Sequence, residues 1–271
     1  MRRSARVGAA VLLTLTLMAG GVGLALRGAR LRQEALSRES ALEQAQLPGP
    51  ALPPEEEPET VSEPELEDGE TRRLRELDLD ALRAVNPQVV GWISIPGTAI
   101  DYPLVQGEDN RHYLDHSWDG RASAAGAIFL ECKNDPRFLD FSTILYGHYM
   151  GDGSMFNALK NYGEQDFLEE HPRVYLALED EVAVYGVFAA LRVTVTDPVY
   201  WLGVSEEGHK ETVIRFCRDH SGVESGLPVG TEDRLLLLST CVGLLPSEER
   251  WVVAAVELGR VPRGRTGDGA E

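Results

Sequence analysis

The chain has 271 residues, of which 26 are Lys or Arg and 44 are Asp or Glu, so its formal net charge is −18. Apolar residues make up 43%, which is enough for a sizeable core and excludes a chain that is disordered throughout. The acid excess argues against a nucleic-acid-binding protein and against docking to anionic lipid through a basic patch. Three cysteines are too few for a disulfide framework, and no Cys-x-x-Cys pair indicates a zinc or redox site.

An uncharged run of twenty residues, Val7–Leu26, lies near the N-terminus. As a helix it would extend roughly 30 Å, the thickness of the hydrocarbon core of a membrane. The run is longer than the apolar region of a cleaved signal peptide, about 7–15 residues, and no usual cleavage site follows it. We expect residues 1–30 to form an uncleaved membrane anchor, with a removed signal peptide as the alternative. Arginines flank the run on both sides, so charge leaves its orientation open.

The next segment, residues 31–70, reads as a membrane-proximal helix followed by a linker. Leu31–Gln46 is a short polar helix in which Glu34 and Arg38 are spaced i,i+4. Leu47–Glu70 contains six prolines and nine acidic residues and cannot bury enough apolar surface to fold. It is predicted to be an extended spacer of up to roughly 75 Å. A tail that only adds solubility is a compatible alternative.

Residues 71–260 form the predicted globular domain, and 261–271 a flexible C-terminal tail. Short runs rich in β-branched and aromatic residues recur between Gly, Pro, Asn and Asp, as expected of strands. The runs are Val89–Ile95, Ile100–Val105, Ala127–Leu130, Thr143–Tyr146, Val174–Leu178, Val182–Val195, Leu235–Ser239 and Trp251–Leu258. Eight strands favour a closed or nearly closed β-barrel, with a β-sandwich as the second choice.

Helices are predicted at the periphery of this barrel. One covers Asp78–Val85, and a second region combines Met155–Asn161 with Glu164–Glu170. A third helix covers Ser205–His220, with Val213, Phe216 and Cys217 on one face. The predicted fold class is therefore mainly β: a closed eight-stranded barrel with peripheral helices, plus an N-terminal transmembrane helix.

Cys241 is the candidate nucleophile. It follows four consecutive leucines, Leu235–Leu238, which predict a strand covered on both faces, and the run turns polar at Ser239 and Thr240. A cysteine at the end of such a strand would be held rigidly and open to a substrate, although a small buried core residue is the alternative. Cys217 is interpreted as a core residue and Cys132 as structural, and a disulfide between these two stays open.

Arg250 begins the strand that follows Cys241. If the two strands pair antiparallel, Arg250 lies beside Cys241, since neighbouring strands are about 4.8 Å apart. Arg234 and Arg260 would then lie at the opposite end of the pair. An arginine beside a cysteine can stabilise a thiolate or donate to a developing oxyanion. A salt bridge with Glu248 or Glu249 is the alternative interpretation.

His148 is the candidate acid or base. It follows the strand Thr143–Tyr146 and precedes a turn-rich loop, so it also lies where a strand ends. His112 and His116 are spaced i,i+4, but the zincin pattern needs Glu after the first histidine and Tyr113 stands there. We therefore predict no metal site. The remaining histidines are interpreted as solvated or capping residues.

These motifs resemble those of class B sortases. Tyr146-Gly147-His148-Tyr149-Met150 is similar to the histidine motif of that family, and Leu238-Ser239-Thr240-Cys241 is similar to its cysteine motif. Arg250 with Trp251-Val252-Val253 resembles the arginine that begins the last strand. The runs 90–97 and 100–107 resemble the opening strands, and the helix at 205–220 resembles the extra helix of class B. The resemblance covers about residues 77–258.

The resemblance implies a cysteine transpeptidase that needs no cofactor. Cys241 would form a thioacyl intermediate with a sorting motif of a secreted protein, His148 would transfer the proton, and Arg250 would hold the substrate or stabilise the oxyanion. The acceptor would be an amine of a peptidoglycan precursor or a pilin. The resemblance also implies a single-pass membrane protein of a Gram-positive type envelope, with its catalytic domain outside the cytoplasm.

The substrate-binding residues are predicted with fewer observations. Tyr146, Ser239 and Thr240 flank the catalytic candidates, and Tyr200 resembles a groove position of class B enzymes. Tyr149 departs from the family, which often has Asn there, and so does Val242-Gly243 after the cysteine. Two alternatives stay open: a secreted cysteine peptidase that only hydrolyses, and an inactive membrane-tethered binding barrel.

Overall fold

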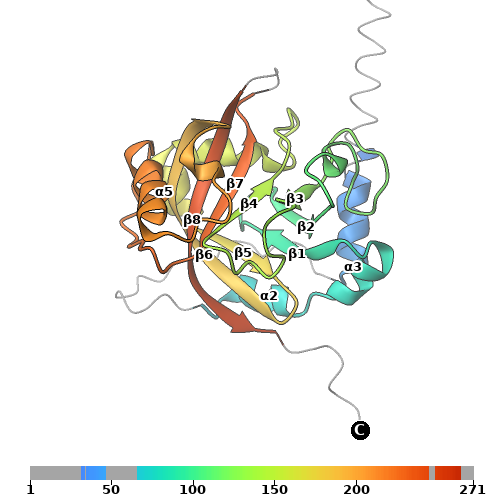
Figure 1. Cartoon of the computed structure of the whole chain (residues 1–271). Coiled ribbons are helices and arrows are strands. Elements are labelled where there is room, and N and C mark those ends of the chain that lie inside the picture. The colour runs from blue at the N-terminus through green and yellow to red at the C-terminus, as the bar shows by residue number, and fades with distance from the viewer. Residues whose placement is uncertain (1–31, 34, 47–65, 244–247, 264–271) are drawn as a thin grey trace, which may run out of the picture.

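The computed structural model describes residues 32–46 except 34, residues 66–243 and residues 248–263 (Figure 1). Its centre is a closed barrel with the strand order β1-β2-β3-β4-β7-β8-β6-β5. The strands are β1 (Val89–Ser94), β2 (Asp101–Val105), β3 (Ile128–Leu130), β4 (Ser142–Tyr146), β5 (Arg173–Ala177), β6 (Glu181–Thr194), β7 (Leu235–Cys241) and β8 (Glu249–Pro262). The prediction of a closed eight-stranded barrel is confirmed.

The barrel mixes parallel and antiparallel neighbours. β2 pairs with β3 and β4 pairs with β7 in parallel, and the other neighbouring strands are antiparallel. Parallel neighbours require a crossover connection. Between β4 and β7 this crossover contains β5, β6 and most of the helical elements. As a result, β4 and β7 end at the same edge of the barrel although about ninety residues separate them.

The leucine run of β7 is buried on both faces, as the sequence predicts. Leu236 and Leu238 belong to the core cluster inside the barrel. Leu235 and Leu237 belong to a second cluster, outside the barrel, that includes Val213 of α5 (Glu207–Asp219). Because side chains of a strand alternate between its two faces, four leucines in a row fill both clusters. β7 is therefore a strand fixed from two sides.

The other helical elements lie at the ends and sides of the barrel (Figure 1). α3 (Leu79–Val85) starts at Asp78, whose side chain accepts a hydrogen bond from the Ala81 amide. α4 (Gln165–Glu170) forms as expected, but the region before it is a 3₁₀ helix, η2 (Phe156–Gly163), with short η1 (His112–Leu114) and η3 (Pro198–Tyr200) elsewhere. On α5, Ile214 is buried with Val213 and Cys217, whereas Phe216 is only partly buried.

The N-terminal part of the described chain packs on the barrel. Residues 32–44, apart from the undescribed position 34, are helical, and Ala41 and Ala45 are fully buried in the cluster that contains Trp92 of β1. A second helix, α2 (Gly69–Arg75), begins after Asp68, which caps it at the Thr71 amide. The sequence interpretation placed the first helix in the tether and the boundary of the globular domain, at residue 71, within α2. The first helix packs mainly through two small alanines, spaced i,i+4, with the partly buried Leu42 beside them, a face that a search for large apolar residues does not detect.

Several expectations fall outside the described residues. The anchor expected at Val7–Leu26 and most of the linker lie there, as does Glu34, the expected helical partner of Arg38. Within the described ranges no helix has both the length and the apolarity needed to cross a bilayer. At the other end, β8 continues to Pro262, two residues past the predicted end of the globular domain at 260.

A buried ion cluster joins α2 to the first two strands. The Arg73 guanidinium lies 2.5 Å from a Glu70 carboxylate oxygen and 2.8 Å from an Asp101 oxygen. Asp101 also accepts a 2.7 Å hydrogen bond from the Trp92 indole. All three charged side chains are at most 5% exposed. Loss of the arginine would therefore leave two carboxylates buried without their main partner.

Arg73→Ala is expected to lower the free energy of unfolding by about 3–5 kcal/mol, because it removes one partner of a buried ion cluster. Urea unfolding followed by circular dichroism measures this loss. Arg75→Ala is the matched control on the same helix, since its bridge to Glu67 is solvent-exposed and should contribute less than about 1 kcal/mol. Equal losses in the two variants would contradict the expectation.

Candidate active site

The register of three strands brings the catalytic candidates to one edge of the barrel. β4 and β7 run parallel with Tyr146 opposite Ser239, so His148 and Cys241 each lie two residues beyond this pair. β7 and β8 run antiparallel with Cys241 directly opposite Arg250. The cysteine therefore lies between the other two, on the middle strand. The structure thus has the cross-strand placement of Arg250 that the sequence predicts.

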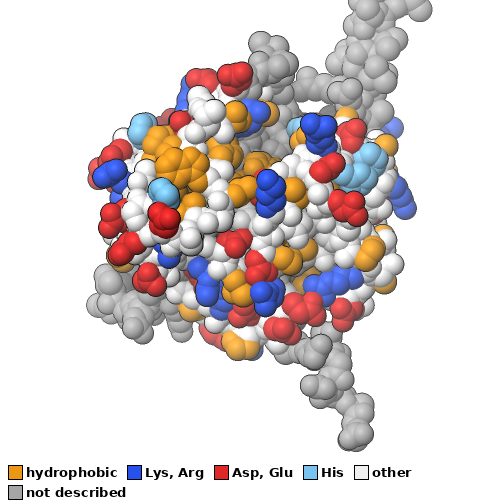
Figure 2. Space-filling model, viewed as in Figure 1, with side chains coloured by type: hydrophobic (Ala, Val, Ile, Leu, Met, Phe, Trp, Pro, Cys, Tyr) orange, Lys and Arg blue, Asp and Glu red, His pale blue; other side chains and the backbone are white. Residues whose placement is uncertain are grey.

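These residues line one open groove of about 350 Å³. All seven residues predicted for the site are among those lining it: Tyr146, His148, Tyr200, Ser239, Thr240, Cys241 and Arg250. The groove lies between the end of β6 and η3 on one side and the connection of β2 to β3 on the other. Figure 2 shows that hydrophobic side chains gather on this face, between the side of α5 and that connection. Such a groove suits an extended peptide with apolar side chains.

His148 is held by backbone groups of two segments. Its Nε2 atom lies 2.7 Å from the carbonyl oxygen of Leu114. Its own carbonyl accepts a 3.0 Å hydrogen bond from the Phe156 amide, which closes the loop behind it. Tyr149 and Met155 form an isolated bridge across the same loop. The histidine is thus fixed in place although it lies in a turn-rich loop.

The opposite wall of the groove is built on Tyr200. Its phenol lies 2.7 Å from the Ser239 hydroxyl, so η3 is joined to the strand that carries Cys241. Burial raises the pKa of Tyr200 to about 12, and the hydrogen bond to Ser239 and the charge of Arg250 partly oppose this shift. The phenol therefore stays protonated, and the contact persists, throughout the neutral and mildly alkaline range.

The side chain of Tyr146 is held by the buried carboxylate of Glu131. Its phenol donates to the carboxylate of Glu131, which is only 4% exposed and also accepts from Asn110. Burial, followed by the adjacent Glu131 charge, raises the pKa of Tyr146 well above its usual value. Tyr146 and Asn110 both line the groove, so this acid orders two side chains of its wall at once.

Five further residues line the groove: Gly147, which belongs to the histidine motif, and Asn110, Leu114, Phe129 and Val195, which sequence reasoning missed. Asn110 and Leu114 lie in the connection of β2 to β3, which shows no hydrophobic periodicity that would have indicated a role. Phe129 and Val195 fall inside or at the end of predicted strands, and the half-exposed position of Val195 marks it as a surface residue. The hydroxyl of Thr240, by contrast, is buried and has no hydrogen-bond partner among the described residues.

The remaining cysteines and histidines are not among the groove-lining residues, although the Cys132 amide donates to the side-chain oxygen of Asn110. Cys132 and Cys217 are free, so the disulfide left open between them is absent from the structure. Burial raises the pKa of Cys217 to about 12, as suits a core thiol. His112 and His116 stack on each other at 4.2 Å, and the described residues contain no metal-binding group of three or more ligands.

Comparisons with known proteins point to one family. The family described as "Sortase domain" matches residues 93–258. The chain is 38% identical over 167 residues to Sortase B of Listeria monocytogenes serovar 1/2a. The aligned region covers 60% of this chain and 67% of that protein. Solved structures of sortase B are also similar, and two of them, each with a TM-score of 0.63, show bound molecules. One is a Staphylococcus aureus sortase B–substrate complex, at 30% identity over 66% of this chain and 83% of that one. The other is a sortase B complexed with triglycine, at 29% identity over 69% and 86%.

The family match spans more than half of the chain and includes the strands that carry Cys241 and Arg250 and the loop that carries His148. The fold agrees as well, since the two solved sortases match 66% and 69% of this chain with a TM-score of 0.63. The chain therefore belongs to the sortase family of cysteine transpeptidases, and to its class B.

Proposed function

We propose that this sortase cleaves a sorting motif in a secreted protein and transfers the acyl group to an amine of a peptidoglycan precursor or a pilin. One observation carries the proposal: the strand register places Cys241 between His148 and Arg250 in a single groove. In this proposal Cys241 is the nucleophile, His148 transfers the proton, and Arg250 stabilises the oxyanion. The solved complex of a similar sortase B with its substrate supports a peptide substrate for this chain too.

In the first half of the reaction, the thiolate of Cys241 attacks the carbonyl carbon of a peptide bond in the motif. A sulfur–carbon bond forms, and the carbonyl oxygen becomes an oxyanion. The tetrahedral intermediate then collapses. The carbon–nitrogen bond breaks, and protonated His148 gives its proton to the departing amine. The product of this half is a thioacyl-enzyme.

In the second half, an amine enters where the first one left. Neutral His148 takes a proton from the attacking nitrogen, a new amide bond forms, and Cys241 departs as a thiolate. The cycle thus restores both the thiolate and the protonated imidazole. Arg250 lies across from Cys241 and stabilises the oxyanion in both halves, as a charged donor in a preorganised site.

The acceptor must be positioned, because water at about 55 M competes for the same intermediate. A similar sortase B has been solved complexed with triglycine, a peptide with a free amino group. This supports an amine of a cell-wall precursor as the acceptor in this chain. The groove is open to solvent, so an acceptor amine can approach Cys241 from outside.

We place the catalytic barrel outside the cytoplasm, held to the cell membrane by residues 1–30. The uncharged run Val7–Leu26 supports an anchor, and the class B assignment supports the orientation that the flanking arginines leave open. Secreted substrates and cell-wall amines would then be present on the same side of the membrane as the groove.

The decisive experiment incubates the full chain with a library of sorting-motif peptides, with and without an added amine such as triglycine. Mass spectrometry should show a peptide–amine conjugate, and the thioacyl-enzyme should be trapped at Cys241. Cys241→Ala should yield neither product. Hydrolysis alone at saturating amine would favour a peptidase, and undiminished turnover by Cys241→Ala would remove this sulfur from the mechanism.

Arg250→Ala is expected to lower kcat/KM by about 10²–10³-fold, the usual cost of removing an oxyanion donor. Arg234→Ala is the matched control on the same strand pair, because Arg234 lies at the opposite end and bridges Glu257 there. Its kcat/KM should stay within about twofold of the parent, as for a surface ion pair. Similar losses in both variants would show that the effect comes from the strand pair rather than from the groove.

The pH dependence of kcat/KM should be bell-shaped, because the first half of the reaction needs a thiolate that attacks and an imidazole proton for the leaving amine. Tyr200 adds no further limb between pH 5 and pH 10, because its pKa is raised to about 12 and its phenol stays protonated. A steady rise in kcat/KM from pH 5 to pH 10 would contradict the assignment of His148 as the acid.

A further inference from the structure

The hydrogen bond between His148 and Leu114 determines which nitrogen of the imidazole carries a proton. A backbone carbonyl oxygen can only accept a hydrogen bond, and it lies 2.7 Å from Nε2. Nε2 must therefore be the donor, and neutral His148 is the tautomer with its proton on Nε2. The proton exchanged during the reaction then resides on Nδ1. The Leu114 carbonyl holds the ring in the same orientation in both protonation states.

Gly126 is the residue that permits this contact. It has a φ of +63°, and a Cβ atom there would lie 2.4 Å from the Tyr113 carbonyl oxygen and 3.0 Å from that of Leu114. The same Cβ would also lie 3.1 Å from Cδ2 of His148. The neighbouring Ala127 amide donates to the Tyr113 carbonyl at 2.9 Å, which fixes the two segments against each other. Carbonyl, glycine and imidazole are thus in direct contact.

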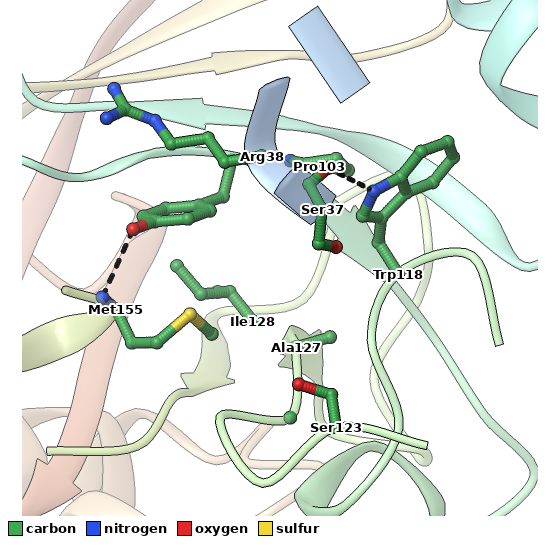
Figure 3. A pocket seen from close by; sticks show the side chains of 10 residues that line it. Ser37, Arg38, Pro103, Trp118, Ser123, Ala127, Ile128 and Met155 are labelled. Atoms are coloured by element: carbon green, nitrogen blue, oxygen red, sulfur yellow. Dashed lines mark hydrogen bonds between the residues drawn. The ribbon is translucent and has the colours of Figure 1, made fainter. Parts of the chain in front are cut away.

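The N-terminal helix, residues 32–44, holds the same connection from its outer side (Figure 3). The indole of Trp118 donates to the Ser37 carbonyl at 3.0 Å, and the side-chain amide of Gln33 donates to the Ala122 carbonyl at 2.5 Å. The cavity between this helix, β2, β3 and the connection measures only about 20 Å³. Close packing of this kind transmits a displacement rather than absorbing it.

We propose that the connection between β2 and β3, held by helix 32–44, positions the imidazole of His148 for proton transfer. The Leu114 carbonyl selects the Nε2–H tautomer, and Gly126 is a positioning residue that allows the carbonyl and the ring to approach. Helix 32–44 is thereby part of the support of the catalytic centre, through Trp118. This inference rests on the proposed role of His148 as the proton carrier.

The first test reads the tautomer directly in the full chain. Nitrogen-15 NMR of the histidine side chains distinguishes Nε2–H from Nδ1–H, and the signals that disappear in His148→Ala identify this residue. The parent should show the Nε2–H form at alkaline pH. A parent with the Nδ1–H form would overturn the inference whatever the variants do.

The second test compares two glycines in the same connection. Gly126→Ala should lower kcat at least about tenfold, because a displaced imidazole loses part of the rate acceleration that proton transfer provides. KM should change little, and the tautomer signals of His148 should change. Gly120→Ala is the matched control, because its φ is +79° and nothing lies within 4 Å of the added Cβ. It carries similar backbone strain and should keep both kcat and the signals. A folded Gly126→Ala with the kcat and tautomer of Gly120→Ala would overturn the role of Gly126.

The third test addresses the helix and applies even if Gly126→Ala fails to fold. Trp118→Phe keeps an aromatic ring but removes the N–H group that reaches Ser37. We expect kcat to fall by about two- to thirty-fold with altered His148 signals. Parent values of both would overturn the contribution of the helix. Separately, full turnover by His148→Ala would refute the proposed function itself, an outcome distinct from all of these.

Discussion

The parallel pairing of β4 with β7 is the constraint on which the rest of the site depends. Two strands far apart in the chain end at one edge because the crossover between them returns the chain in the same direction. The antiparallel pairing of β7 with β8 then adds Arg250 from the other side. A shift of either register by one residue would turn Cys241 or its partners to the opposite face of the sheet. The leucines that fill both faces of β7 hold that register.

Around this edge, short polar contacts give the groove its shape. Tyr200 is joined to Ser239, and Tyr146 and Asn110 are joined to the buried Glu131. Each contact connects a loop or strand end to an element of the barrel. Tyr200 and Ser239 hold each other within the groove lining, and Glu131, which is not part of the lining, holds Tyr146 and Asn110. Partners of this kind fix side chains in the geometry that precise catalysis requires.

Much of this could be predicted from the sequence because alternation and strand-end residues are local signals. The eight strands were predicted to within a few residues, and the pairing of Cys241 with Arg250 follows from a short loop between adjacent strands. The position of Leu114 beside His148 could not be predicted, because it involves a backbone carbonyl and any side chain would leave it unchanged. The packing of helix 32–44 was missed because only small alanines are fully buried there, and the partly buried Leu42 and Arg38, which reaches Asp101, complete the contact.

The docked helix also changes how far the enzyme can reach. Helix 32–44 and α2 both contact the barrel, so a linker between them has its two ends attached to one body. Such a linker cannot set the height of the barrel above a bilayer. With the anchor proposed for residues 1–30, only the few residues between Leu26 and Arg32 remain for that purpose, about 20 Å at full extension. With that anchor, the groove would lie close to the membrane surface.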